Sequence, residues 1–325
     1  MEVSPQKGNL VEKIRIGISA CLLGEQVRYD GGHARDRYIT DTLGQYFEFV
    51  PVCPETEAGF GIPREPMRLV GDPGSPHLVT IKTGKDMTRR LIAWARKRVK
   101  DLESEGLCGI IFKSKSPSCG IERVKVYRDD GMPVKKGVGL FARSFMQHFP
   151  FVPAEEEGRL HDPHLRENFV ERVFALKRWR SVLARGKSIG NLVDFHTHHK
   201  YLILSHSPQY YRQMGKLVAE AKSLKPRELY ALYGELLMKA LSHRATTRKH
   251  TNVLQHMMGY FKKVLSPDQK QELLEVIGAY HQGLVPLIVP VTLINHYVRK
   301  YDQGYLREQV YLHPHPLELK LRNHA

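Results

Sequence analysis

Three cysteines constrain this sequence most, because each stands shortly after an apolar run rich in β-branched residues. They are Cys21, Cys53 and Cys119. Such runs predict buried strands, and the carboxyl ends of parallel strands share one edge of a sheet, where ligands usually bind. We therefore expect the three thiols to meet at one crevice. Cys108 begins a run instead, so we expect it at the opposite edge, buried as an ordinary apolar residue.

The first half of the chain, from residue 14 to about 150, alternates strand-like and helix-like segments, which is typical of an α/β domain. We predict a Rossmann-like, mostly parallel sheet. The clearest helix spans about 86–104, with apolar residues spaced by three and four and basic residues between them. The predicted strands are 15–18, 47–52, 107–112, 124–127, 138–141 and 149–152.

The acidic stretch 155–157, followed by Gly158, marks a boundary, and beyond it the apolar period becomes helical. We predict a catalytic domain over 1–157 and an all-α domain over 158–325. The expected helices are 163–184, 189–206, 208–221, 226–243, 246–265, 267–282 and 286–301, and residues 311–325 read as an extended tail.

The charge of the chain concerns its partners more than its fold. Lys and Arg number 50 against 34 Asp and Glu, for a formal net charge of +16. A polyanion such as RNA or DNA and a merely basic surface both explain this excess. Nothing in the sequence is apolar enough to span a membrane, residues 1–13 do not read as a secretory leader, and the cysteines show no disulfide spacing. We expect a reducing cytoplasm, no membrane contact and no obligate protein partner.

The three cysteines allow two interpretations. They are structural thiols, or they are thiolates gathered to bind zinc or an iron–sulfur cluster. Glu55 lies two residues after Cys53, where burial could raise its pKa and suit it to acid or base work. It could equally be an acid at a helix start. Ser116 and Ser118, beside Cys119, either bond sulfur or substrate or cap the loop.

The segment after Cys21 supplies candidate substrate contacts in Arg28, Tyr29, Asp30 and His33. They are polar groups expected near the mouth of the same crevice.

The predicted helical domain holds two further sets of candidates. One is a polar surface for an RNA backbone, set against a plain solvated helix face: Arg244, Arg248, Lys249, Asn252, Gln255 and His256. Tyr210, Tyr211, Arg212, Tyr260 and Tyr297 add aromatic and basic groups for stacking without deciding between the two. The other is a weak metal hypothesis on Asp194, His196, His199 and Lys200, set against histidines that pair with backbone, carboxylates or phosphate.

The cysteine segments resemble the thiouracil desulfurase (TudS) family. The resemblance rests on four motifs in order: Ser-Ala-Cys-Leu-Leu-Gly at 19–24, Val-Arg-Tyr-Asp-Gly-Gly-His at 27–33, Cys-Pro-Glu at 53–55 and Lys-Ser-Pro-Ser-Cys-Gly at 115–120. The second half is similar to a helical domain fused to such cores, with Asp-Phe-His at 194–196, Thr-Asn-Val-Leu-Gln-His at 251–256 and Leu-Arg-Asn-His at 321–324. The whole chain therefore resembles the two-domain RudS group.

The resemblance implies that Cys21, Cys53 and Cys119 hold a 4Fe-4S cluster whose fourth iron takes the thiocarbonyl sulfur of the substrate. It implies removal of sulfur from 4-thiouridine in tRNA without redox chemistry, with water replacing sulfur and sulfide leaving. Glu55 and one serine, with Ser116 preferred over Ser118, are the implied catalytic positions. Two alternatives remain: a desulfurase of free thiouracil or thiouridine nucleotides, and a non-catalytic iron–sulfur or zinc sensor that binds nucleic acid.

Overall fold

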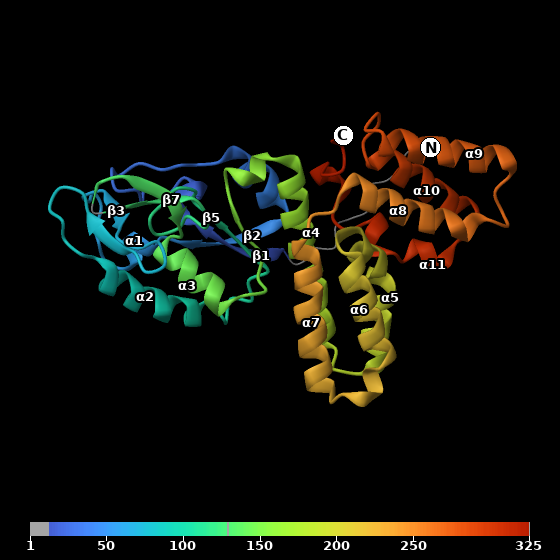
Figure 1. Cartoon of the computed structure of the whole chain (residues 1–325), viewed down its shortest axis with the longest axis horizontal. Helices are drawn as coiled ribbons and strands as arrows, with labels where there is room; N and C mark the ends of the chain where they lie inside the picture. Colours follow the sequence, from blue (N-terminus) through green and yellow to red (C-terminus); the bar gives the residue numbers. More distant parts are fainter. Residues whose placement is uncertain (1–12, 129, 325) are drawn as a thin grey trace. The chain divides into compact units, whose positions relative to one another are not determined.

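A computed structural model describes residues 13–128 and 130–324. Residues 1–12, where the sequence was searched for a leader, Asp129 and the last tail residue, Ala325, lie outside the described residues. The chain forms two compact units, Met1–Pro150 with Ala154–Glu157 and Phe151–Pro153 with Gly158–Ala325. The first is α/β and the second is helical (Figure 1). This confirms the predicted fold class.

A four-stranded parallel sheet forms the centre of the α/β unit. Its strands lie in the order β2 (Phe47–Val52), β1 (Ile14–Ser19), β5 (Gly109–Phe112) and β8 (Ala154–Glu156). Strand β1 is almost wholly buried and β5 wholly so, as expected for a parallel sheet covered on both faces. Pro51 is tolerated because β2 is an edge strand. The register pairs Ser19 with Val52, so the two strands end level with each other.

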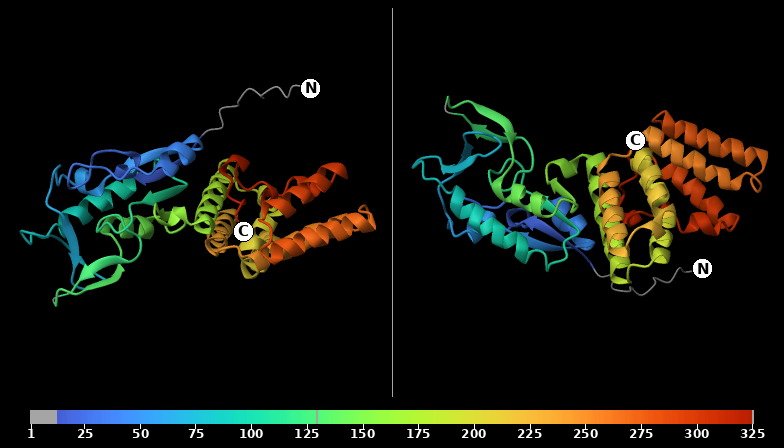
Figure 2. Two further views of the ribbon diagram at one scale, coloured as in Figure 1. Left: turned by 90° about the horizontal axis from the view of Figure 1, so that it is seen from above. Right: turned by 60° about the horizontal axis from the view of Figure 1, so that its bottom comes forward.

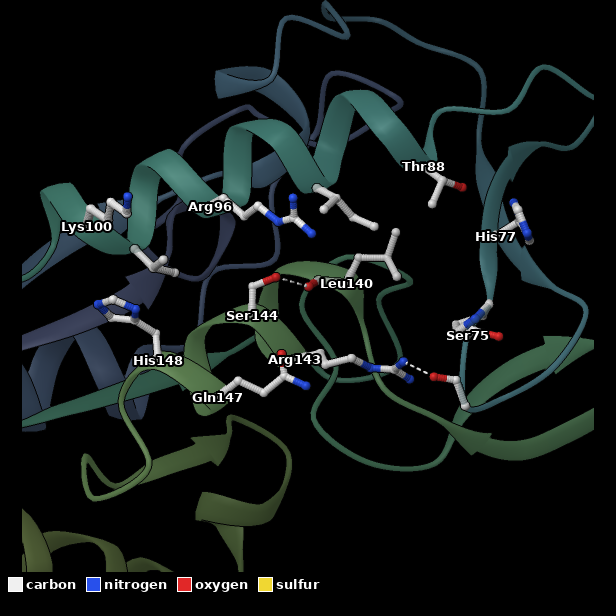
Figure 3. Close-up of a pocket in the computed structure, with 14 residues that line it drawn as sticks. Ser75, His77, Thr88, Arg96, Lys100, Leu140, Arg143, Ser144, Gln147 and His148 are labelled. Atoms are coloured by element: carbon white, nitrogen blue, oxygen red, sulfur yellow. Dashed lines mark hydrogen bonds between the residues drawn. The ribbon is translucent and has the colours of Figure 1, made fainter.

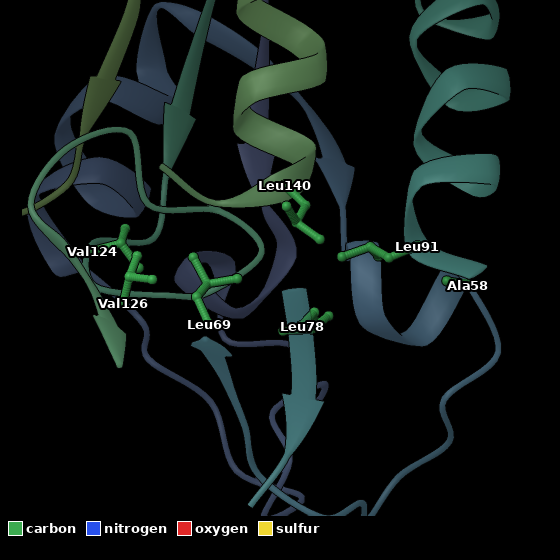
Figure 4. Close-up of a cluster of buried hydrophobic side chains, with 7 residues drawn as sticks. All are labelled: Ala58, Leu69, Leu78, Leu91, Val124, Val126 and Leu140. Atoms are coloured by element: carbon green, nitrogen blue, oxygen red, sulfur yellow. The ribbon is translucent and has the colours of Figure 1, made fainter. Parts of the chain in front are cut away.

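A second sheet and two helices complete this unit. The sheet has the order β4 (His77–Thr80), β3 (Met67–Val70), β6 (Val124–Tyr127) and β7 (Pro133–Gly137). Helices α2 (Thr88–Asp101) and α3 (Leu140–His148) run side by side (Figures 1 and 2). Figure 4 shows the apolar cluster that joins them to this sheet: Ala58, Leu69, Leu78, Leu91, Val124, Val126 and Leu140.

Several predicted strands are wrong. Residues 138–141 are not a strand, because β7 ends at Gly137 and α3 begins at Leu140. A short apolar run does not distinguish a strand from the buried start of a helix. The last strand is β8 rather than 149–152, and it is hidden in the sequence by its Ala-Glu-Glu composition. Strands β3 and β4 were not predicted.

The helical unit follows the predicted pattern. Its helices are α4 (Pro163–Ala184), α5 (Ile189–His206), α6 (Pro208–Ala219), α7 (Pro226–Ser242), α8 (Thr247–Met258), α9 (Pro267–His281), α10 (Ile288–Lys300) and the short α11 (Gly304–Arg307). Side-chain caps fix several starts, including Asp162 for α4, Ser207 for α6 and a capping box at Ser266 for α9. The helix predicted over 246–265 is too long, because a 3₁₀ turn at Gly259–Phe261 follows α8. The tail holds 3₁₀ turns at Val310–Leu312 and Leu317–Leu319 rather than being simply extended.

A buried ion network anchors that tail to α4 and α5. The Arg322 guanidinium lies 2.9 Å from Glu171 Oε1 and 3.2 Å from Glu167 Oε1, and His206 Nε2 is 3.0 Å from Glu171 Oε2. Burial and the Glu171 charge raise the pKa of Glu167 to about 8. Burial opposes the charge on Glu171, but His206 and Arg322 outweigh it and hold the Glu171 pKa below its usual range. The last segment is therefore part of the helical core.

Among the described helices, none has the length and apolar character needed to cross a bilayer.

The start of α3 approaches the Cys119 loop so closely that position 139 has room only for glycine. A Cβ on Gly139 would lie 2.5 Å from the Ser118 carbonyl carbon and 2.7 Å from the Cys119 nitrogen. Since those are backbone atoms, Gly139→Ala should force the loop to move and lower the free energy of unfolding by about 2 kcal/mol. The measurement is urea unfolding followed by Trp94 fluorescence in a Trp179→Phe background.

Gly44→Ala is the matched control in the same unit, because its new Cβ meets only the Phe49 ring, at 3.5 Å, and the Ile39 carbonyl, at 3.7 Å. Equal losses from the two substitutions would contradict the close approach.

Candidate active site

A cavity of about 360 Å³ lies at the carboxyl edge of the parallel sheet. Its walls are residues 19–21, 27–29, 52–55 and 113–119, completed by Arg64, Pro66 and Met67. Three of these segments directly follow β1, β2 and β5. The sheet edge predicted from the sequence is therefore a real concavity.

The three strand-end cysteines all line this cavity. Cys21 lies in a 3₁₀ turn, Ala20–Leu23, and Cys53 directly precedes the short helix α1 (Pro54–Glu57). Cys119 is buried, the other two are half-buried, and all are free thiols. Cys108 is buried at the start of β5, where its N–H donates to the Arg15 carbonyl at 2.9 Å. The contrast predicted between Cys108 and the other three is confirmed.

Burial keeps the Cys21 and Cys119 thiols neutral. Burial and the neighbouring Cys53 raise the pKa of Cys21 to about 11. Burial also raises the pKa of the Cys119 thiol well above its ordinary value. Because metal ligands must be deprotonated, loading a metal here would release protons.

The geometry of the sulfurs distinguishes between metal groups. A tetrahedral zinc ion with Zn–S bonds of about 2.3 Å requires thiolate sulfurs about 3.8 Å apart. In the described part of the chain, the group of three ligand atoms mutually within 4.8 Å is Glu167, Glu171 and His315, not the cysteines. Three soft donors spread around one cavity fit a larger group, such as an iron–sulfur cluster, better than a single ion.

Backbone hydrogen bonds shape the Cys119 loop. Ser116 Oγ accepts the N–H groups of Cys119 at 3.1 Å and Ser118 at 3.3 Å. Carboxylates of the β8 segment fix the two flanks of the loop, Glu157 accepting from Ser114 N–H at 2.6 Å and Glu156 from Ile121 N–H at 2.8 Å. The acidic stretch that marked a boundary in the sequence is thus also a buried support for the site.

Glu55 lies at the centre of a polar chain. Ser118 Oγ donates to Glu55 Oε1 at 2.6 Å, and Ser116 Oγ lies 3.0 Å from Ser118 Oγ. Since Ser118 gives its proton to the carboxylate, the bond between the two hydroxyls runs from Ser116 to Ser118. The structure brings all three expected catalytic side chains together, with Ser118 rather than Ser116 touching the carboxylate.

Arg64 is the site residue that sequence reasoning missed. Its Nε and Nη2 lie 2.7 and 2.5 Å from Glu55 Oε2, and Nη2 also donates to the Val27 carbonyl at 3.0 Å. Both partners are largely buried, so the Arg64 guanidinium compensates the charge of the carboxylate where little water can reach it. Arg64 stands in an irregular Gly-Ile-Pro-Arg segment with no motif to reveal it.

The four predicted substrate contacts separate into two pairs. Arg28 and Tyr29 line the cavity, with the Arg28 guanidinium 5.6 Å from the Tyr29 ring centroid. Asp30 and His33 are not in the cavity wall. Asp30 Oδ1 accepts from Gly32 N–H at 3.0 Å, and His33 Nδ1 accepts from Arg35 N–H at 3.2 Å. Both hold the local turn.

With this geometry established, comparison with known proteins gives a family. The 2-thiouracil desulfurase family model matches residues 16–157. The uncharacterized protein YbgA of Escherichia coli K12 is 34% identical over 47% of this chain and 90% of its own length. The uncharacterized protein YbbK of Bacillus subtilis 168 is 32% identical over 32% of this chain and 71% of its own. The chain belongs to the 2-thiouracil desulfurase family.

A second family model, described as a protein of unknown function (DUF1722), matches residues 200–316 of the helical domain. A solved structure titled as a [4Fe-4S]-dependent thiouracil desulfidase, TudS, is 30% identical. The match covers 46% of this chain and 95% of that one, with a TM-score of 0.38. The two family models, over 16–157 and 200–316, describe a desulfurase-family core fused to a helical domain.

The helical domain has a groove of its own, with a volume of about 540 Å³. Four of the predicted RNA contacts line it, namely Arg248, Lys249, Asn252 and His256, and the facing wall includes Tyr201, Tyr211 and Arg212. The predicted contacts Arg244 and Gln255 are exposed but lie outside it. Tyr297 is buried, so it is not available for stacking.

The weak metal hypothesis on α5 finds no support in the geometry. His196 Nδ1 bonds Tyr233 Oη at 3.0 Å, His199 Nδ1 bonds the Phe195 carbonyl at 2.8 Å, and Asp194 faces His198 at 3.7 Å. These side chains serve separate partners. The Glu167, Glu171 and His315 group is no better, because the Arg322 guanidinium already provides its positive charge.

The Glu55–Arg64 pair can be tested by a double-mutant cycle. Arg64→Met leaves a buried carboxylate without its cation and should lower the free energy of unfolding of the desulfurase domain by about 3 kcal/mol. Adding Glu55→Gln removes that uncompensated charge, so the double variant should lose at least about 1 kcal/mol less than the sum of the singles. Urea unfolding under reducing conditions measures all four corners, and strictly additive losses would contradict the pairing.

Proposed function

We propose that this chain is a desulfidase that converts 4-thiouridine in tRNA to uridine, in the cytoplasm, with release of sulfide. One observation carries the proposal. The three strand-end thiols and the Ser118–Glu55–Arg64 chain share a single cavity. That cavity lies within the part of the chain that matches the 2-thiouracil desulfurase model.

The cofactor we propose is a 4Fe-4S cluster held by Cys21, Cys53 and Cys119. The spread of the sulfurs around the cavity supports a cluster over a single ion. With three protein ligands, the bound cluster would offer one open iron as a soft Lewis acid for a thiocarbonyl sulfur.

The polar chain supplies the proton chemistry. Arg64 and Ser118 each bond one oxygen of the Glu55 carboxylate and so hold it in place, and Glu55 is the group that accepts a proton from water. The water oxygen bonds to the pyrimidine carbon as the carbon–sulfur bond breaks, the protons pass to Glu55 and to the departing sulfide, and no electrons change hands. Hydrolysis of this kind needs no external reductant.

The helical domain supports the choice of tRNA as substrate. Its groove combines Arg212, Arg248 and Lys249 with the half-buried ring of Tyr211. Cations for phosphates and aromatic faces for bases are the usual means of binding unpaired RNA. Residues 151–325 hold 26 Lys and Arg against 16 Asp and Glu, so the domain as a whole attracts a polyanion.

A second candidate is desulfuration of free thiouracil or a thiouridine nucleotide. The family description, which names 2-thiouracil, favours it. Only the cavity would be needed for such a substrate.

The iron content of purified variants distinguishes the proposed cluster ligands from the proposed acid–base residue. After anaerobic reconstitution, Cys21→Ser, Cys53→Ser and Cys119→Ser should each lose most of the iron and acid-labile sulfide, whereas Cys108→Ser should retain both. Glu55→Gln should keep the iron but lose turnover by about 100-fold, because an amide cannot accept the proton. Full iron in Cys119→Ser, or an active Glu55→Gln enzyme, would overturn the assignment.

Thiolated tRNA tests the substrate. Wild-type protein should convert tRNA 4-thiouridine to uridine, measured by nucleoside analysis, and Arg212→Gln with Arg248→Gln should weaken tRNA binding roughly tenfold. The charge-matched control is Lys262→Gln with Lys263→Gln, two exposed residues outside the groove. Turnover of free thiouracil with unchanged tRNA would establish the second candidate instead.

A further inference from the structure

The desulfurase domain has a second hollow, a groove that the proposed reaction does not use. It has a volume of about 720 Å³ and runs between α2 and α3 (Figure 3). Its lining on α2 extends from Thr88 to Lys100 and on α3 from Leu140 to His148, with the loop before β4 closing one end. Twelve helical steps correspond to about 18 Å, longer than a single phosphate requires.

The groove is electropositive. Arg96 and Lys100 face it from α2 and Arg143 from α3, and no carboxylate is part of its wall. Arg96 and Lys100 are exposed and make no ion pair within the described residues. The Arg143 guanidinium, in contrast, holds the carbonyls of Pro73 and Gly74. Two cations are therefore available to a ligand, and a third fixes the wall.

The other lining groups suit a phosphodiester chain. Gln147 adds an amide and Ser75 a hydroxyl near the rim, while Ile92 and Val99 form an apolar floor. Separated cations with hydroxyl and amide groups beside them are typical of contacts to a nucleic-acid backbone. An acidic protein would also find positive charge here, but the length of the groove favours a linear polyanion.

One end of the groove abuts the active-site loop. The N–H of Leu140, which lines the groove, donates to the Pro117 carbonyl at 3.2 Å, and Gly139 N–H donates to the Gly120 carbonyl at 2.7 Å. The start of α3, which lines the groove through Leu140, is therefore bonded to the segment that carries Ser118 and Cys119 and lines the cavity.

We infer that the α2–α3 groove binds the RNA backbone on one side of the thiolated nucleotide, giving the desulfurase domain its own contact with tRNA. This inference rests on the proposed function. It assigns Arg96 and Lys100 as phosphate contacts that are independent of the helical domain, and it makes tRNA a substrate that this domain recognises beyond the base.

The test is Arg96→Gln with Lys100→Gln in the full-length, cluster-loaded enzyme. On thiolated tRNA, kcat/KM should fall about tenfold, and the slope of log kcat/KM against log salt should become shallower by about 1.5 to 2. On free 4-thiouracil, kcat/KM should change less than twofold. The matched control is Arg89→Gln with Lys97→Gln, which removes two exposed charges of α2 outside the groove and should leave both substrates unaffected.

Each other outcome has a distinct meaning. If the groove variant and the control variant lose kcat/KM on tRNA equally, the effect is one of diffuse charge, and the proposed RNA contact in the groove is overturned. If the Arg96→Gln, Lys100→Gln variant loses kcat/KM on a thiouridine monophosphate but not on tRNA, the groove is a nucleotide site and the inference is overturned. If wild-type enzyme converts no tRNA, the proposed function fails. Binding of a uridine 12-mer, measured by fluorescence anisotropy, then tests the groove alone. Weaker binding by the Arg96→Gln, Lys100→Gln variant, with the control variant unchanged, supports the groove. Equal binding by wild type and both variants overturns it.

Discussion

Everything at the candidate site depends on the level ending of three parallel strands. The register sets Ser19 opposite Val52, and β5 continues the same sheet beside β1. The next residues of each strand must therefore leave at the same edge, which is where Cys21 and Cys53 stand. A slip of one residue would turn every side chain of a strand to the other face and shift the residues after it, so the register of β2, β1 and β5 fixes the position of the thiols.

Beyond the strands, buried carboxylates do the positioning. Glu157 and Glu156 bind the backbone on the two flanks of the Cys119 loop, and Glu55 binds Arg64 and Ser118. Burial raises the pKa of Glu156, which shows that charge is costly there. A buried carboxylate persists where hydrogen bonds compensate it, and those same bonds make the loop rigid.

The sequence predicts what depends on local pattern. Apolar periodicity located β1, β2, β5 and nearly every long helix, and the position of Cys53 after a strand placed it at the site. Prediction from the sequence failed where tertiary contacts, and not local composition, decide the structure. Strand β8 is Ala-Glu-Glu, yet it is buried because its carboxylates meet backbone N–H groups. Arg64 acquires its role only when an irregular segment folds back onto Glu55, and neither basic groove can be read from one helix because each has two walls.

Hydrogen bonds and one ion pair hold the loops that carry the three candidate ligand cysteines. In small zinc domains the metal supplies the folding energy, because nothing else holds the ligand loops. Here Ser116, Glu157 and the ion pair of Glu55 with Arg64 hold those loops without using a thiol. The neutral, buried Cys119 thiol contributes as an apolar group to the same core. A cluster in this cavity would therefore be a chemical component rather than a structural staple, and its loss would remove activity before it removed the fold.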